Sequence, residues 1–249
     1  MTAPLHLERY RRVVVLTGAG ISVASGLPTF RGPGGLWERE DGPGARGLDA
    51  KHLAEDPAGV WRFCAELRAQ IRAAAPNPAH LALAAAEAAM PTDATWTVIT
   101  QNVDGLHQRA GSRRVIELHG ALERTRCTSA ACETEPFVDA SESLDLPLCR
   151  ACGAPLRADV VLFDEEIPGG AEWHAKRALR ECDLFVAIGT SGTVSPASNF
   201  VRAAEFARAR TVIVNLTPMS PRNPAYDEEI LGRAEDLLPE LFQLPSTSP

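Results

Sequence analysis

The sequence predicts an α/β protein built on a doubly wound parallel sheet. Short, nearly continuous apolar runs recur along the chain, as is typical of strands buried on both faces of a parallel sheet. Helix-like segments lie between several of these runs, and alternating strands and helices favour a doubly wound arrangement. Polar residues follow the last predicted strands, at the edge where such sheets bind ligands. The predicted strands span 13–16, 97–100, 115–118, 160–163, 184–188 and 211–216, and the predicted helices span 79–89, 171–180 and 196–209.

Two stretches do not follow this alternation. Residues 32–78 are rich in glycine, proline and charge, and an amphipathic helix is predicted there over 60–71. Residues 121–158 hold paired cysteines and show little periodicity. We expect the two stretches to form a smaller second domain beside the sheet.

The composition is that of an ordinary soluble globular protein, with 45% hydrophobic and 23% charged residues. The 25 basic and 32 acidic side chains give a net charge of −7, which does not favour nucleic acid or an anionic membrane as a partner. No stretch approaches the roughly 20 apolar residues that span a bilayer. The charges near the N-terminus precede no apolar run of the signal-peptide type. We therefore expect a cytoplasmic protein.

A glycine-rich turn follows the first predicted strand. Gly18, Ala19 and Gly20 lie there with Ser22, and small residues let backbone N–H groups approach a pyrophosphate at the start of a helix. The full G-x-G-x-x-G pattern is absent because residue 23 is valine. Taken alone, the turn fits either a phosphate-binding loop or an ordinary tight connection.

Polar side chains also follow two further predicted strands. Gln101, Asn102 and Asp104 come after the strand at 97–100; they fit a ligand site, because buried polar groups are costly unless paired, but also an ordinary turn. His119 ends the strand at 115–118, and an imidazole titrates in the range that suits a general base. Because all these residues fall at strand ends on one edge, together they favour an active site.

Four of the six cysteines form two close pairs, Cys127 with Cys132 and Cys149 with Cys152. In a reducing compartment this spacing favours a metal over disulfides. Four thiolates suit a tetrahedral Zn²⁺ whose closed ligand shell is structural. The sequence thus predicts one structural zinc ion, and Cys64 and Cys182 are predicted to pack as small apolar residues.

These motifs resemble those of the sirtuin family, and the resemblance runs along nearly the whole chain. The matching segments are GAGIS (18–22), SGLPTFRG (25–32), TQNVDGLH (100–107), ELHG (117–120), the four cysteines, LRADVVLFDEEIP (156–168), GTS (189–191), VNL (214–216) and LGRAEDLLPEL (231–241). The resemblance implies a Rossmann-like NAD-binding domain of residues 1–35, 79–120 and 159–249. A helical insertion at 36–78 and a zinc-binding insertion at 121–158 would form the small domain.

The resemblance also implies an activity. NAD would be consumed as a co-substrate while an acyl group leaves a protein lysine, giving nicotinamide, free lysine and O-acyl-ADP-ribose. His119 would be the general base, with Asn102 as the second catalytic residue. The residues implied in NAD binding are Gly18, Ala19, Gly20, Ser22, Phe30, Arg31, Gln101, Asn102, Asp104, Gly189, Thr190, Ser191, Asn215, Leu216 and Ala234. Those implied in holding an extended peptide are Val160, Val161, Leu162, Phe163, Gly192 and Val194.

Two segments depart from the family's pattern. Where its desuccinylating branch has Tyr-x-x-Arg, this chain has Cys64 and Leu67. Acidic acyl groups are therefore expected to be poor substrates unless Arg68 or Arg72 compensates. The peptide-binding segment differs at three positions where the family often has His, Trp or Phe, and Gly, namely Asp159, Leu162 and Asp164.

Two other classes of function are open to this sequence. The same scaffold could transfer ADP-ribose to a protein or hydrolyse NAD outright, although an intact His119 favours deacylation. A non-enzymatic zinc module that binds nucleic acid would need a basic face around the cysteines. The segment 133–145 is instead acidic, with Glu133, Glu135, Asp139, Glu142 and Asp145. We expect an acylated-lysine protein as the partner, no nucleic acid, no membrane, and a monomer.

Overall fold

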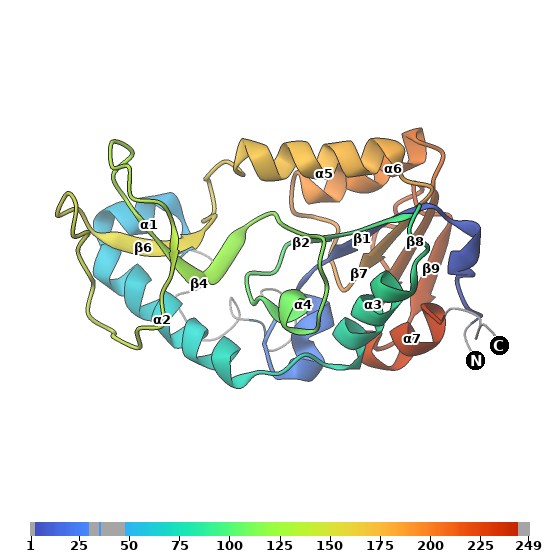
Figure 1. Ribbon diagram of the computed structural model, residues 1–249, viewed down its shortest axis with the longest axis horizontal. Helices are drawn as coiled ribbons and strands as arrows, with labels where there is room; N and C mark the ends of the chain where they lie inside the picture. The colour runs from blue at the N-terminus through green and yellow to red at the C-terminus, as the bar shows by residue number, and fades with distance from the viewer. Residues whose placement is uncertain (1–2, 30–34, 36–47, 244–249) are drawn as a thin grey trace.

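A six-stranded parallel sheet forms the centre of the larger part of the molecule (Figure 1). The computed structural model describes residues 3–29, 35 and 48–243. The order across the sheet is β3 (Val115–Glu117), β2 (Thr95–Thr100), β1 (Arg12–Thr17), β7 (Leu184–Ile188), β8 (Arg210–Asn215) and β9 (Glu228–Leu231). Every neighbouring pair is parallel. The strand order runs outward from β1 in one direction and from β7 in the other, which confirms the predicted doubly wound sheet.

Helices cover both faces of this sheet because its strands are buried on both sides. In β1, Val13 and Val15 point into the core under α3 (Pro78–Ala89) and α7 (Ala234–Leu241). Val14 and Leu16 point into the opposite core, under α5 (Gly169–Glu181) and α6 (Phe200–Phe206). Figure 1 shows α5 and α6 on one side of the sheet and α3 and α7 on the other.

A second, three-stranded antiparallel sheet lies at the far end of the molecule, on the left in Figure 1. Its order is β5 (Phe137–Val138), β4 (Gly120–Cys127) and β6 (Leu156–Val160). Two helices, α1 (Ala50–Glu55) and α2 (Pro57–Ala73), lie beside it and share its core. The chain therefore enters this part at two separate places in the sequence. The remaining short elements are η1 (Leu7–Arg9), η2 (Ala19–Ser25), α4 (Leu106–Arg109) and η4 (Ala197–Asn199).

Local chemistry explains where the longer helices begin. The side chain of Asn77 accepts from the backbone N–H of Ala79, and Pro78 follows it in the first turn of α3. Asp56 accepts from the backbone N–H of Gly59 in the same way at the start of α2. Such caps satisfy N–H groups that have no partner within the helix. None of the helices in the described part of the chain is both long and apolar enough to cross a bilayer.

One predicted strand was assigned to the wrong sheet. The run at 160–163 was expected in the parallel sheet, but Val160 is the last residue of β6, which pairs antiparallel with β4. A short apolar run shows that a segment is buried but not which neighbour it has. The sixth parallel strand is β9, which the sequence did not predict. The predicted helix over 196–209 is shorter, since η4 precedes the α-helical residues of α6.

Candidate active site

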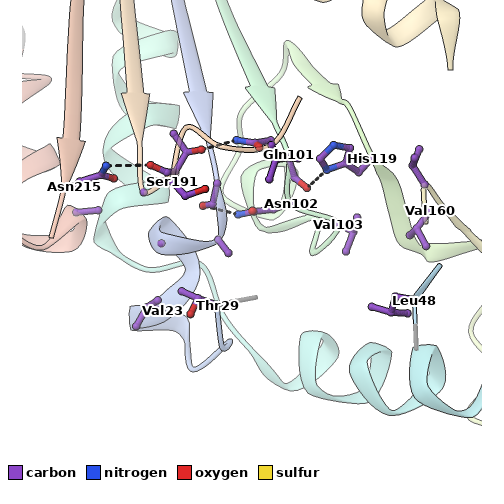
Figure 2. A pocket seen from close by; sticks show the side chains of 18 of the residues that line it. Val23, Thr29, Leu48, Gln101, Asn102, Val103, His119, Val160, Ser191 and Asn215 are labelled. Atoms are coloured by element: carbon purple, nitrogen blue, oxygen red, sulfur yellow. Dashed lines mark hydrogen bonds between the residues drawn. The ribbon is translucent and has the colours of Figure 1, made fainter. Parts of the chain in front are cut away.

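A cavity of about 500 Å³ opens at the carboxyl ends of β1, β2, β7 and β8 and extends toward β6 and α2 (Figure 2). Such a position, where the strand order reverses, is where doubly wound sheets hold ligands. Most of the residues predicted for the site line this cavity. They are Gly18, Ala19, Gly20, Gln101, Asn102, His119, Val160, Val161, Leu162, Phe163, Gly189, Thr190, Ser191, Val194, Asn215, Leu216 and Ala234.

The glycine turn packs directly against a second turn that follows β7. The N–H of Gly20 donates to the carbonyl of Gly189 over 2.9 Å. A Cβ on Gly20 would lie 2.6 Å from the Cα of Gly189, closer than real Cβ contacts come. Gly189 itself has a φ of +60°, which favours glycine. Close backbone packing, together with the cavity beside it, thus accounts for the small residues at 18–20.

Asn102 is held in place by groups that lie behind it. Its side-chain N–H₂ donates to the carbonyl of Gly18 and to the hydroxyl of Ser22, each over 3.2 Å. The Ser22 hydroxyl donates in turn to Asp104 over 2.7 Å, and that carboxylate also accepts from the N–H of Leu106. Burial raises the pKa of Asp104, and these hydrogen bonds oppose the shift. Ser22 and Asp104 do not line the cavity; they orient Asn102, which does.

Two amide side chains fasten the turn after β7 to its neighbours. Gln101 donates to the hydroxyl of Thr190 over 3.0 Å, and Asn215 donates to the Thr190 carbonyl over the same distance. Figure 2 shows Gln101 and Asn215 reaching this turn from opposite sides. The residues predicted from three separate motifs therefore form one connected rim.

His119 lies where this polar rim ends. Its Nδ1 is 2.9 Å from the backbone carbonyl of Gln101, so Nδ1 carries the proton and Nε2 keeps its lone pair (Figure 2). Burial lowers the pKa of His119, and the bond to the Gln101 carbonyl opposes that shift in part. A neutral imidazole with one free ring nitrogen can accept a proton from a group in the cavity.

Beyond His119 the cavity is lined by apolar side chains. Burial raises the pKa of the Cys64 thiol to about 11, so it stays uncharged and adds to this apolar wall. The wall comes from α2, β4, β6 and the segments around residues 48 and 103, and consists of Leu48, Cys64, Leu67, Val103, Leu122, Val160 and Leu162. Leu48, Val103 and Leu122 were not predicted, because an isolated apolar residue carries no local mark of a binding site.

The two arginines that could have charged this wall are bound elsewhere. Arg68 is 1% exposed and donates to the carbonyl of Leu122 and to the carboxylate of Asp139. Arg72 donates to the carbonyls of Asp139 and Ser141. Neither lines the cavity. Neither arginine is therefore placed to bind an acidic acyl group and so to compensate for Cys64 and Leu67.

The segment at 160–163 runs between two parts of the backbone. The N–H of Val161 donates to the carbonyl of His119 over 2.9 Å. Phe163 exchanges backbone hydrogen bonds with Leu48 and Ala50 on the other side. Val194 also lines the cavity, but Gly192 does not. Phe30 and Arg31, also predicted for the site, lie outside the described residues.

The four predicted cysteines lie together at the end of the small sheet. Their sulfurs are all within 4.8 Å of one another, with 3.5 Å between Cys127 and Cys152 and 3.7 Å between Cys132 and Cys149. Sulfurs around a tetrahedral zinc ion with 2.3 Å bonds lie about 3.8 Å apart. The cluster thus fits a zinc site of four thiolates. Cys64 and Cys182 are buried elsewhere, as predicted.

Comparisons with known proteins identify the family of this chain. Residues 18–196 match the model of the Sir2 family. The chain is 47% identical over 238 residues to NAD-dependent protein deacylase 2 of Pyrobaculum aerophilum, covering 95% of this chain and 92% of that one. It is 42% identical over 240 residues to NAD-dependent protein deacylase 1 of Pseudomonas aeruginosa, covering 94% of each.

Solved structures give the same result. A crystal structure of a Sir2 homolog–NAD complex superposes with a TM-score of 0.85 at 36% identity, covering 95% of this chain and 90% of that one. A Sir2 complex with a deacetylated p53 peptide and 3′-O-acetyl ADP ribose gives a TM-score of 0.80 at 31% identity, covering 94% and 93%. The fold with its doubly wound sheet is shared with these structures, and the match extends to the sequence. The chain belongs to the Sir2 family.

Proposed function

We infer that the chain is an NAD-dependent protein deacylase. The observation that carries this conclusion is the position of His119, a neutral imidazole between a polar rim and an apolar chamber of one cavity. A dinucleotide and an acyl chain need these two kinds of surface, and a proton acceptor is needed where they meet. The relatives named as NAD-dependent protein deacylases support the same conclusion.

NAD is proposed to lie along the polar rim. Its phosphates would face the backbone of residues 18–20, where two glycines and an alanine let a ligand approach closely. The nicotinamide ribose would contact Gln101 and Asn102, next to His119. The adenosine half would lie at the opposite end of the rim, against Gly189, Thr190, Ser191, Asn215, Leu216 and Ala234.

The proposed reaction uses the acyl-lysine carbonyl oxygen as the nucleophile. This oxygen bonds to the anomeric carbon of the ribose as the bond to nicotinamide breaks, and an alkylimidate results. His119 Nε2 then accepts a proton from a ribose hydroxyl, whose oxygen attacks the imidate carbon. Addition of water and departure of the lysine amine leave O-acyl-ADP-ribose. Asn102, fixed by Ser22 and Gly18, would hold the ribose in the geometry that this step requires.

The acyl group is proposed to enter the apolar chamber. Cys64 and Leu67 face this chamber, and Arg68 and Arg72 are bound to other groups. A carboxylate buried there would lose water without gaining a charged partner, which costs several kcal/mol. Uncharged acyl groups are therefore the proposed substrates, carried by an acylated-lysine protein whose backbone runs along 160–163 and Val194.

We further propose that the four cysteines hold one structural Zn²⁺. The sulfur spacing and the closed set of four thiolates support zinc, and such a set leaves no open position for catalysis. The ion would hold the ends of β4 and β6 in place. The compartment and a monomeric state stay predictions.

A test combines purified protein, NAD and an acetyl-lysine peptide. Mass spectrometry should detect nicotinamide, free peptide and O-acetyl-ADP-ribose in equal amounts. Release of nicotinamide without formation of deacetylated peptide would indicate an NAD hydrolase. A peptide that gains the mass of ADP-ribose would indicate a transferase. Absence of the corresponding O-acyl-ADP-ribose with every uncharged acyl peptide contradicts the proposal.

A further inference from the structure

Asp164 occupies a backbone position that favours glycine. It is the third residue of a four-residue turn in which the N–H of Glu165 donates to the carbonyl of Leu162 over 3.1 Å. Its φ is +65°, in the left-handed region. Most residues with a Cβ are strained there; glycine is preferred, and asparagine and aspartate are the side chains that tolerate it best. Aspartate is thus compatible with this turn, and its side chain lies at the border of the cavity.

The turn that carries Asp164 is held in place by an ion pair and by hydrogen bonds to the backbone. Arg157 is 5% exposed and forms a two-pronged ion pair with Glu165, with Nη2 3.0 Å from Oε2. The same Arg157 nitrogen donates to the carbonyl of Val160 over 2.9 Å. The Glu165 carboxylate also accepts from the N–H of Leu162 over 2.8 Å. Asp164 therefore has a fixed place beside the segment 160–163.

Asp164 also supplies an uncompensated charge to the cavity. Among the described residues, four charged side chains line the cavity, and three of them are paired: Glu165 with Arg157, and Arg233 with Glu235. The fourth is Asp164, which is exposed. Within the described part of the chain, no hydrogen bond or ion pair involves its carboxylate. A negative charge is thus available to a ligand at the border of the cavity next to residues 160–163.

We propose that Asp164 selects acyl-lysine substrates that carry a basic residue beside the acylated lysine. The inference rests on the proposed function, in which the peptide runs along 160–163. An acylated lysine has no charge of its own, so the ionic attraction of a carboxylate at this place acts on charged neighbouring side chains of the substrate. Because exposed ion pairs are weak, we expect a preference of about two- to fivefold in KM, with kcat little changed.

Three acetyl-lysine peptides test the proposal. They differ only in the residue next to the acetyl-lysine, which is arginine, glutamine or glutamate. With saturating NAD, the wild type should have the lowest KM for the arginine peptide and the highest for the glutamate peptide. Asp164→Asn keeps the shape of the side chain and should bring the three KM values together. Glu166→Gln is the matched control, because Glu166 is also exposed but does not line the cavity, and this variant should keep the preference.

The preference should also shrink in about 1 M salt, where charges are screened within about 3 Å. Binding of the three peptides, followed by fluorescence anisotropy, gives a readout that does not depend on turnover. Charge-dependent binding without any O-acetyl-ADP-ribose would contradict the proposed function but support the role of Asp164. Equal affinities of the wild type for the three peptides would overturn the role of Asp164. A preference for the arginine peptide that survives in Asp164→Asn would overturn it as well.

Discussion

The imidazole rings of His80 and His107 pack edge to face inside the protein, with their centroids 4.9 Å apart. His107 Nε2 lies 2.9 Å from the hydroxyl of Thr17, the residue before the glycine turn. His80 Nε2 and His107 Nδ1 are buried and have no partner among the described residues. A proton added to either ring would therefore place an unpaired charge in the core beneath the cavity.

This pair makes stability depend on pH. Burial lowers the pKa of His107 to about 3 and that of His80 to about 4. In the unfolded chain each would titrate near 6.5. Stability is thus fully present above pH 6.5. It falls as the pH drops toward 4, because only the unfolded state takes up the protons.

The expected slope is about 1.4 kcal/mol per pH unit for each histidine. Urea unfolding at pH 7.0, 6.0 and 5.0 measures it. His107→Gln removes one titrating ring, so its free energy of unfolding should fall less steeply than that of the wild type by about this amount. Parallel pH profiles for the two proteins would exclude a buried neutral His107.

His119→Ala should separate the two halves of the reaction. The proposed base acts after nicotinamide has left, so the variant should still exchange labelled nicotinamide into NAD. Deacylation should fall by about 10²- to 10⁴-fold. His174→Ala, an exposed histidine on α5, is the control and should retain both activities. A His119→Ala variant with full deacylation would show that another group accepts the proton.

The pH profile gives a second check on His119. Its pKa lies below the ordinary value, so the neutral form should persist below pH 6.5. Wild-type kcat/KM should therefore hold to that pH and fall only on further acidification. A loss of activity already complete at pH 7 would mean that His119 is protonated in the folded enzyme.

The acyl chamber can be changed by two substitutions on one face of α2. Cys64→Tyr together with Leu67→Arg places a phenol and a guanidinium three residues apart, where both native side chains line the cavity. Activity on succinyl-lysine peptide should rise about tenfold or more, since a carboxylate would gain charge-assisted hydrogen bonds. Activity on acetyl-lysine should fall. Strong desuccinylation by the wild type would contradict the apolar chamber.

Loss of zinc should destabilise the protein and reduce its activity. β4 begins one residue after His119 and ends at Cys127, so this strand connects the proposed base to the metal module. Replacing Cys149 and Cys152 by serine should lower the zinc content from one ion per chain, measured by mass spectrometry, and lower the melting temperature by several degrees. Cys182→Ala should leave the zinc content unchanged. Equal zinc in both proteins would exclude the four-cysteine site.

The sequence predicted most of the large sheet because its strands are buried on both faces. β7, for instance, is entirely apolar and entirely buried. β9 was missed because it is an edge strand with two acidic residues and only Ile230 buried. The error at 160–163 arose because the strand's partner lies 40 residues away in sequence, at Gly120. The division into two domains at the predicted boundaries stays a prediction.

The candidate site was predictable where its chemistry is polar. Gln101, Asn102 and His119 were found because amides and imidazoles at strand ends are unusual. Asp104 was recognised for the same reason, but only the structure places it behind Asn102. The apolar wall was largely missed, because Leu48 and Leu122 reach the cavity only through the tertiary fold.

The contact between Gly20 and Gly189 also restricts how this chain can evolve. Each glycine occupies the space that the other's side chain would need, so alanine at either position pushes against backbone that cannot yield. A mutation at one position has no single compensating mutation at the other, because glycine is already the smallest residue. The backbone of one turn can therefore change position only if the other turn shifts with it. In a randomised library selected for folded protein, we expect both positions to return glycine.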